Sequence, residues 1–231
     1  MDGVLQAHNL QQHLAGEAAL RGVSFSLLPG EFAVLLCPEG AGKTALLRIL
    51  AGFSKPSFGR VHLKGQDITP LPPHRRGLHS LFADTPLLPG RSALQNAAYG
   101  LQRQGLPRKE RRERALRALA LVGLLEAADK KPRHLSPREQ VLTALARALA
   151  PGPQALLLDD PFARLEAPER RAALQMLAAL QEREGIPVLY ATPSREEAAA
   201  FAHRVLLMLG GRIEQAGAPK EVYLRPASPR A

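Results

Sequence analysis

One eight-residue segment constrains the fold more than any other part of this 231-residue sequence. Residues 37–44 read Cys-Pro-Glu-Gly-Ala-Gly-Lys-Thr, between an apolar run at residues 32–36 and an apolar helical pattern over residues 43–51. A glycine-rich turn between a buried strand and a helix is typical of a phosphate-binding loop, whose backbone N–H groups point at phosphate oxygens. A chance glycine-rich turn is the alternative, but it does not explain the Gly-Lys-Thr sequence in this setting.

The loop predicts ATP and Mg²⁺ as cofactors. Lys43 would neutralise β- and γ-phosphate oxygens, and the Thr44 hydroxyl would bind Mg²⁺. The strict pattern begins with glycine, whereas this chain has Cys37. We expect Cys37 to be a packed small residue rather than a reactive thiol.

A carboxylate pair supplies the second half of the predicted site. Residues 155–158 are apolar, and Asp159 and Asp160 follow them. This arrangement resembles a Walker B element, in which Asp159 would reach the Mg²⁺ shell, usually through water. A buried strand that ends in a polar turn would explain the apolar run but not the two carboxylates.

The rest of the chain predicts an α/β domain with a helical insertion. Short apolar runs at residues 32–36, 155–158 and 188–191 indicate buried parallel strands. Gly210-Gly211 indicates a two-residue hairpin, and Ser136 with Glu139 indicates a capped helix. The region of about residues 86–150 is expected to be wholly helical, with an apolar face formed by Leu116, Leu119, Ala120, Gly123 and Leu124.

Composition excludes several function classes. The net charge is +10, but the densest basic run, residues 108–114, includes Glu110 and Glu113, four residues before Arg114 and Arg117. This spacing is typical of a solvated helix face. Aromatic residues make up only 4%, so no nucleic-acid partner is expected. One cysteine, the lack of a signal-peptide pattern and the lack of a membrane-length apolar stretch predict a cytoplasmic protein.

With these motifs placed, the chain resembles an ABC transporter ATPase of the importer type. Residues 23–26, 46–52 and 145–150 and Gly211-Arg212-Ile213 carry the resemblance alongside the two motifs. It implies a P-loop NTPase fold of ABC type, with a core sheet, an antiparallel β part and the helical subdomain inserted at about residues 86–150. The expected organisation is one nucleotide-binding domain over residues 1–231 without a C-terminal regulatory barrel. The nucleotide-binding residues that the resemblance implies are Leu14, Cys37, Pro38, Glu39, Gly40, Ala41, Gly42, Lys43, Thr44 and Ala45, with Thr44 and Asp159 at Mg²⁺.

Two family positions that contact nucleotide or metal are altered. The residue aligned with the aromatic that stacks on adenine is Leu14, although the neighbouring His13 could substitute. The Phe-Gln-Asp of the Q-loop is Phe82-Ala83-Asp84 here, so the glutamine is missing. Gln95 lies too far along the chain to replace it.

The signature motif, Leu-Ser-Gly-Gly-Gln in the family, is also altered. This chain has Leu135, Ser136, Pro137, Arg138 and Glu139. Pro137 lacks the N–H that a glycine would direct at a γ-phosphate, and Arg138 adds bulk. The sequence nevertheless forms a good helix start, so a capped helix without a nucleotide role is an equal alternative.

The catalytic positions are replaced as well. Asp160 occupies the position of the family's catalytic glutamate, Pro193 that of the H-loop histidine, and residues 163–166 that of the D-loop. Asp160 is one methylene shorter than glutamate, and Pro193 has neither an imidazole nor an N–H. The resemblance therefore implies an ATPase whose own turnover is slow.

The sequence thus predicts an ATP-binding subunit, peripheral on the inner face of the membrane, that drives partner permeases and pairs with a second ABC ATPase subunit. A heterodimer is slightly favoured, because a homodimer would combine both sets of altered residues in each site. The alternatives are a non-catalytic cassette that docks on a permease or partner ATPase, and a soluble cassette acting on DNA or ribosomes. The second alternative fits less well, since such proteins usually join two cassettes in one chain.

Overall fold

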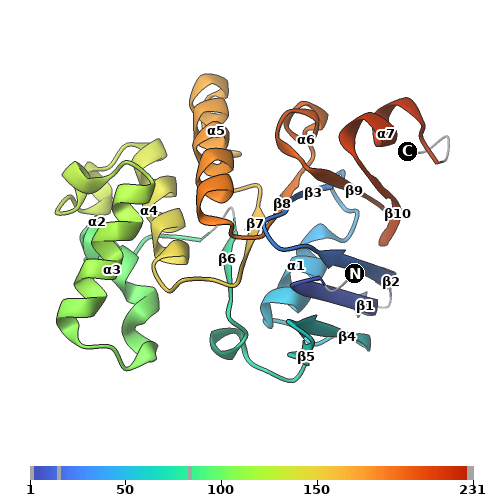
Figure 1. Ribbon diagram of the computed structural model, residues 1–231, viewed down its shortest axis with the longest axis horizontal. Coiled ribbons are helices and arrows are strands. Elements are labelled where there is room, and N and C mark those ends of the chain that lie inside the picture. The colour runs from blue at the N-terminus through green and yellow to red at the C-terminus, as the bar shows by residue number, and fades with distance from the viewer. Residues whose placement is uncertain (1–2, 15–16, 83–84, 228–231) are drawn as a thin grey trace. The chain divides into compact units, whose positions relative to one another are not determined.

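The computed structural model describes residues 3–14, 17–82 and 85–227, and the chain divides into two compact units. Unit 1 contains Met1–Ser80, Gln154–Asp159 and Gln181–Ala231. Unit 2 contains Leu81–Pro153 and Asp160–Leu180. Figure 1 shows the elements of both units.

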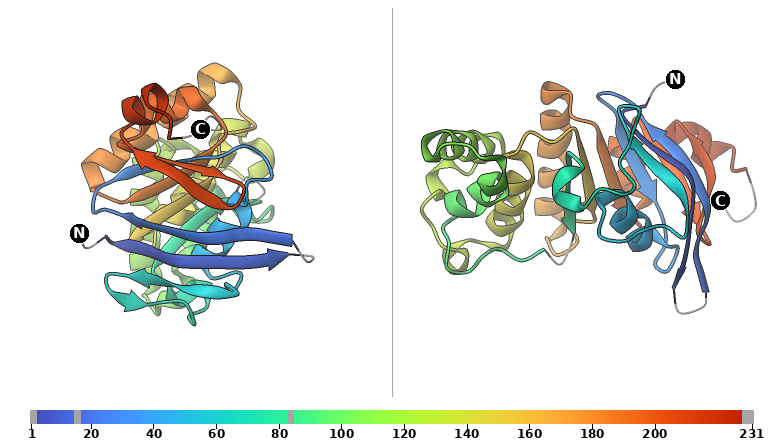
Figure 2. Two further views of the ribbon diagram at one scale, coloured as in Figure 1. Left: turned by 90° about the vertical axis from the view of Figure 1, so that its right-hand side faces the viewer. Right: turned by 90° about the horizontal axis from the view of Figure 1, so that it is seen from below.

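Unit 1 is built on two sheets. The first is antiparallel, with strand order β2-β1-β4-β5, and Figure 2 shows β1 and β2 as a long ribbon. The second has the order β10-β9-β3-β8-β7-β6, in which β9, β3, β8 and β7 are parallel and β10 is antiparallel to β9. The strands are β1 (Leu5–Leu14), β2 (Glu17–Leu27), β3 (Phe32–Leu36), β4 (Phe58–Leu63), β5 (Gln66–Asp67), β6 (Leu78–Phe82), β7 (Ala155–Asp159), β8 (Val188–Thr192), β9 (Arg204–Leu209) and β10 (Arg212–Gly217).

The central parallel strands form the core of unit 1. Every residue of β3, β7 and β8 is buried, as expected for apolar runs in a parallel sheet covered on both faces. The helix α1 (Lys43–Ala51) contacts β7 and β2 and buries Leu46, Leu47, Ile49 and Leu50. These strands and this helix confirm the sequence expectations.

The predicted hairpin joins β9 to β10. Gly210 and Gly211 have φ values of 51° and 80°, as a type I′ turn requires. The backbone of Gly211 accepts from the Arg21 N–H of β2 at 2.8 Å and donates to Ala41 O at 3.1 Å. The hairpin therefore supports the loop that precedes α1.

Unit 2 contains only helices between residues 86 and 150 among its described residues, as expected. Figure 1 shows α2, α3 and α4 packed together. The elements are α2 (Ala93–Ala97), η2 (Ala98–Gln104), α3 (Arg108–Leu121), η3 (Leu125–Ala127), η4 (Pro132–His134), α4 (Pro137–Leu149) and the first part of α5 (Ala167–Glu184), whose end belongs to unit 1.

The apolar face expected around residues 116–124 is partly wrong. The helix α3 ends at Leu121, so Gly123 lies outside it, and Ala120 is exposed. The buried side chains of α3 are Ala115, Ala118 and Leu119, because alanines pack closely against α2 and α4. The expected Glu110–Arg114 ion pair is present at 2.7 Å.

The remaining helices, α6 (Arg195–Phe201) and α7 (Pro219–Leu224), are short. Among the described residues, no helix has the length and apolar character needed to cross a membrane.

Candidate nucleotide-binding site

The loop between β3 and α1 is shaped to bring backbone N–H groups to an anion. Gly42, the N-cap of α1, has φ 96°, and a Cβ there would lie 2.3 Å from Ala19 O, so only glycine fits. No side chain caps the start of α1, and its first turn contains no acidic residue. The positive end of the helix is thus left for a ligand.

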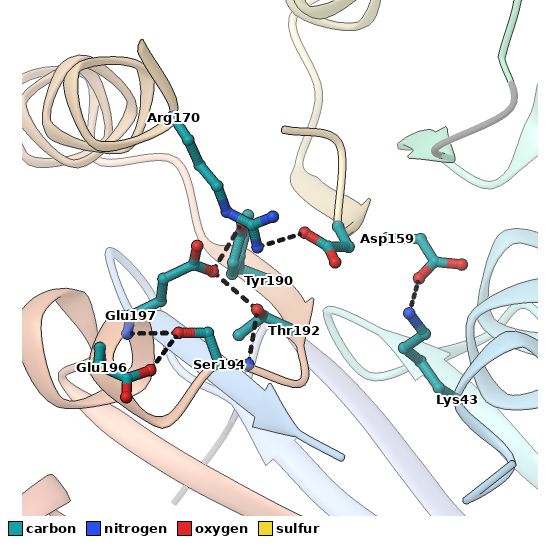
Figure 3. Close-up of polar contacts among 9 residues, drawn as sticks. Lys43, Asp159, Arg170, Tyr190, Thr192, Ser194, Glu196 and Glu197 are labelled. Atoms are coloured by element: carbon teal, nitrogen blue, oxygen red, sulfur yellow. Dashed lines mark hydrogen bonds and ion pairs between the residues drawn. The ribbon is translucent and has the colours of Figure 1, made fainter. Parts of the chain in front are cut away.

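Lys43 and Asp159 meet across this loop. Lys43 Nζ at the start of α1 lies 2.7 Å from Asp159 Oδ1 at the end of β7, as Figure 3 shows. Their side chains are 24% and 11% exposed, so the charges are partly shielded from water. The sequence assigned the two residues to separate motifs, and the fold brings them together.

The residues present fit Mg²⁺ bound together with a nucleotide. The Asp159 carboxylate and the exposed Thr44 hydroxyl are oxygen donors of the kind that Mg²⁺ prefers. No group of three or more His, Cys, Asp or Glu side chains among the described residues could hold a metal alone. Phosphate and water oxygens would therefore have to complete the coordination.

Cys37 is a packed residue, as expected. Its side chain is buried, with 2% exposure, and Sγ donates to Leu35 O at 3.6 Å. Pro38, Glu39 and Gly40 are exposed, and Ala41 is buried. The loop therefore anchors its first residue in the core and presents the following ones to solvent.

Asp160 forms an ion pair that sequence reasoning missed. It follows β7 directly and has φ 41°, in the left-handed region that aspartate tolerates better than most residues. Its Oδ1 accepts from Arg170 Nη2 of α5 at 2.8 Å. A guanidinium bound to a carboxylate favours its charged form and weakens it as a base. No sequence periodicity links the two residues.

Pro193 is exposed in a loop fixed by polar contacts on both sides. Thr192 Oγ1 donates to Glu197 Oε2 at 2.7 Å and accepts from the Ser194 N–H at 3.1 Å. Tyr190 Oη also donates to this Glu197 oxygen, at 3.2 Å (Figure 3). Ser194 caps α6. The loop is ordered, but its central side chain has no polar atom to offer a phosphate.

The altered signature sequence forms the capped helix start that was expected. Ser136 Oγ accepts from the Glu139 N–H at 3.2 Å, and Glu139 Oε2 accepts from the Ser136 N–H at 2.7 Å. The Ser136 N–H and Lys130 lower the pKa of Glu139. Arg138, half-buried, has its Nε atom buried with no acceptor among the described residues.

Other predicted positions lie outside the described residues or have a different local role. Ala83 and Asp84 lie outside the described residues, as does the side chain of Leu14 in β1. His13 is exposed. Gln95 completes a capping box with Ser92 at the start of α2, so it does not replace the missing glutamine.

Comparison with known proteins identifies the chain. An α/β sheet with a phosphate loop between a buried strand and a helix is the fold of a P-loop nucleotide-binding domain. The ABC transporter family profile matches residues 20–163. The chain belongs to the ABC transporter family.

Relatives with curated names are importer subunits. The chain is 40% identical over 226 residues to the Fe(3+) ions import ATP-binding protein FbpC of Rhizobium etli, covering 98% of this chain and 64% of that protein. It is 43% identical over 208 residues to the spermidine/putrescine import ATP-binding protein PotA of Frankia alni, covering 90% and 45%. The chain thus spans about half to two thirds of the length of these relatives.

Solved structures share the fold. CbiO1 from Clostridium perfringens, part of the ABC transporter complex CbiONQ, superposes with a TM-score of 0.86 at 27% identity, covering 98% of this chain and 93% of that chain. A dimeric ATP-binding cassette in a post-hydrolysis state, bound to ADP and Pi, superposes with a TM-score of 0.79 at 28% identity, covering 93% and 98%.

Proposed function

We propose that this chain is the ATP-binding subunit of an ABC importer, at the inner face of the membrane. In this role it couples ATP binding to transport through partner permease subunits and pairs with a second ABC ATPase subunit. The named importer relatives support the role, and one of the similar structures is a nucleotide-bound dimer. The observation that carries the proposal is the Lys43–Asp159 pair beside the uncapped start of α1.

In the proposed site, Mg-ATP places its phosphates against the loop of residues 40–42 and the start of α1. Lys43 would supply positive charge to the β- and γ-phosphates, and Thr44 and Asp159 would hold Mg²⁺. Bound phosphate would compete with Asp159 for Lys43, which would leave the carboxylate free to hold the metal. In the absence of ligand, the Lys43 cation and the Asp159 carboxylate therefore neutralise each other.

Hydrolysis by this chain is proposed to be slow. The carboxylate at the position of the catalytic glutamate is shorter and is bound by Arg170, so it is a poor base for water. The exposed Pro193 offers no group to stabilise the γ-phosphate. Both defects affect groups that act together on one reaction.

Calorimetric titration with Mg-ATP tests the binding site. Substitution Lys43→Ala should weaken binding by more than about tenfold, because a charge-assisted contact to phosphate is lost. The matched control is Lys55→Ala, which removes the same charge from an exposed position. It should leave the affinity unchanged.

A clear result excludes the proposal. If neither the wild-type chain nor the Lys43→Ala variant binds Mg-ATP, or if both bind equally, the nucleotide site is wrong. The second candidate function, a cassette fold that docks on a permease or partner ATPase without nucleotide, would then be preferred. The capped start of α4 favours this candidate, since the N–H groups of Ser136 and Glu139 are already bonded within the capping box.

A further inference from the structure

Four arginines surround a surface hollow in unit 2, far along the sequence from the phosphate loop. The hollow has a volume of about 350 Å³ and lies over α2, η2 and the start of α3. Its arginines are Arg91, Arg108, Arg111 and Arg112, and its one acidic side chain is Asp129. The other lining residues are Ser92, Leu94, Gln95, Ala98 and Gln102.

The direction of the three α3 arginines is set by helix geometry. Arg108, Arg111 and Arg112 are spaced i, i+3 and i+4, and the same stripe continues into the buried Ala115 and Leu119. They therefore lie along the side of α3 that leads to its buried residues, and Arg108 and Arg112 are exposed there. Arg111 is half-buried. The sequence expectation of a solvated basic run holds for Arg114, which pairs with Glu110, and for the exposed Arg108 and Arg112.

The hollow has an excess of unbalanced positive charge. Among the described residues, none of its four arginines forms an ion pair with a carboxylate, and Arg91 instead lies over the Tyr99 ring at 5.4 Å. Like charges held at one place repel each other, and one aspartate does not neutralise four guanidinium groups. An anion would relieve this repulsion. Arginine forks match phosphate oxygens in a bidentate geometry, and the amides of Gln95 and Gln102 add polar hydrogen-bonding groups.

We infer that this arginine hollow, defined by Arg91, Arg108, Arg111 and Arg112, is a second anion-binding site that takes a phosphate-bearing ligand. The phosphate groups could belong to a membrane lipid headgroup or to a free polyphosphate. None of its lining residues belongs to the phosphate loop. The inference does not depend on whether that loop binds ATP.

Calorimetry with inorganic tripolyphosphate tests the site in a Lys43→Ala background, so that the phosphate loop does not contribute. Adding Arg111→Gln and Arg112→Gln should weaken tripolyphosphate binding by at least about tenfold. The matched control is Arg114→Gln with Arg117→Gln, which removes the same charge from residues of α3 that do not line the hollow. It should change the affinity by less than about threefold.

A charge-preserving variant distinguishes bidentate hydrogen bonding by arginine from electrostatic attraction alone. Arg111→Lys with Arg112→Lys keeps both charges but loses the bidentate geometry, so its affinity should fall between those of the wild-type site and the glutamine variant. Thermal unfolding of each variant shows whether the fold is kept. Because the control changes the same helix, a general loss of helix stability would affect both double variants alike.

Vesicle binding distinguishes the two sources of phosphate. Cosedimentation with phosphatidylcholine vesicles, with and without phosphatidic acid, should depend on Arg111 and Arg112 if the ligand is a lipid headgroup. Tripolyphosphate binding without vesicle binding assigns a soluble ligand. The inference is overturned if the Lys43→Ala chain binds neither probe, or if both glutamine double variants lose binding equally.

Discussion

The proposed slow hydrolysis depends first on how the side chain of Asp160 is held. Its left-handed backbone and its 2.8 Å contact with Arg170 both hold the carboxylate in one place. A displacement of about 1 Å from the productive position can cost on the order of 10²-fold in rate. The proposed slow turnover thus depends on an identifiable contact in addition to the shortened side chain.

This leads to a prediction for hydrolysis. The wild-type chain alone should turn over ATP below about 1 s⁻¹, which is slow for an enzyme. The double substitution Asp160→Glu with Pro193→His should raise turnover more than either single change, since the two groups act as a unit. Asp160→Glu alone should raise ATP turnover only slightly, because Arg170 can still bind the longer carboxylate. Glutamate also tolerates the backbone φ of 41° less well than aspartate does.

Steady-state phosphate release by the four purified proteins measures this effect. Lys43→Ala in the double variant is the control for contaminating ATPase. Turnover of 1 s⁻¹ or above by the wild-type chain would contradict the prediction. The prediction would also be wrong if the effects of the two single substitutions on turnover added up to the effect of the double substitution.

At the scale of elements, the helix that follows the phosphate loop is held at its far end by a buried arginine. Arg76 is 2% exposed, and its Nη1 donates to Ile49 O and Leu50 O at 2.7 and 2.9 Å. Its Nε and Nη2 donate to Leu71 O and Thr69 O. Burial lowers the pKa of Arg76. The cation thus satisfies the last carbonyls of α1 and faces the negative end of its dipole.

Removing this cap should destabilise unit 1. Substitution Arg76→Met removes the four hydrogen bonds that Arg76 donates to backbone carbonyls, and we expect a loss of at least about 3 kcal/mol in the free energy of unfolding. Urea denaturation followed by circular dichroism measures it. The control is the exposed neighbour Arg75, whose change to Met should stay within about 0.5 kcal/mol. Equal effects of the two substitutions would show that the buried cap contributes nothing specific.

At the scale of the whole molecule, the altered residues bear on which partner the chain needs. In a sandwich dimer each site takes its phosphate loop from one subunit and its signature from the other. A homodimer would combine Asp160 and Pro193 with Pro137 and Arg138 in both sites. Paired with an intact cassette, each site would carry only one set of changes, so we favour a heteromeric partner.

Arg138 supplies the test of this arrangement. The side chain of Arg138 is half-buried, and its guanidinium would bring positive charge to a phosphate on a partner subunit in place of the missing glycine N–H groups. Mixing the chain with an intact partner cassette should raise ATPase activity above that of the partner alone, and Arg138→Ala should lower it. The same substitution should do little to the isolated chain. If Arg138→Ala leaves the ATPase activity of the mixture unchanged, this role of Arg138 is excluded.

Local patterns in the sequence determined much of the fold. The apolar runs predicted β3, β7 and β8, and the glycines predicted the loop before α1 and the hairpin at Gly210. The Ser136 capping box was also readable, because its two partners lie three residues apart. Such features depend on neighbours in the chain, whose geometry is fixed by backbone conformation and helix period.

The contacts that define the candidate sites were decided only by the tertiary structure. Lys43 meets Asp159, Arg170 binds Asp160 and Arg76 caps α1 because separate elements pack side by side, and no spacing in the sequence reports that packing. The basic run of α3 is the clearest case. Its composition indicated a solvated run, and the structure places three of its arginines, two of them exposed, at one hollow. Sequence spacing supplies the helix period, whereas the neighbouring helices determine which face is covered.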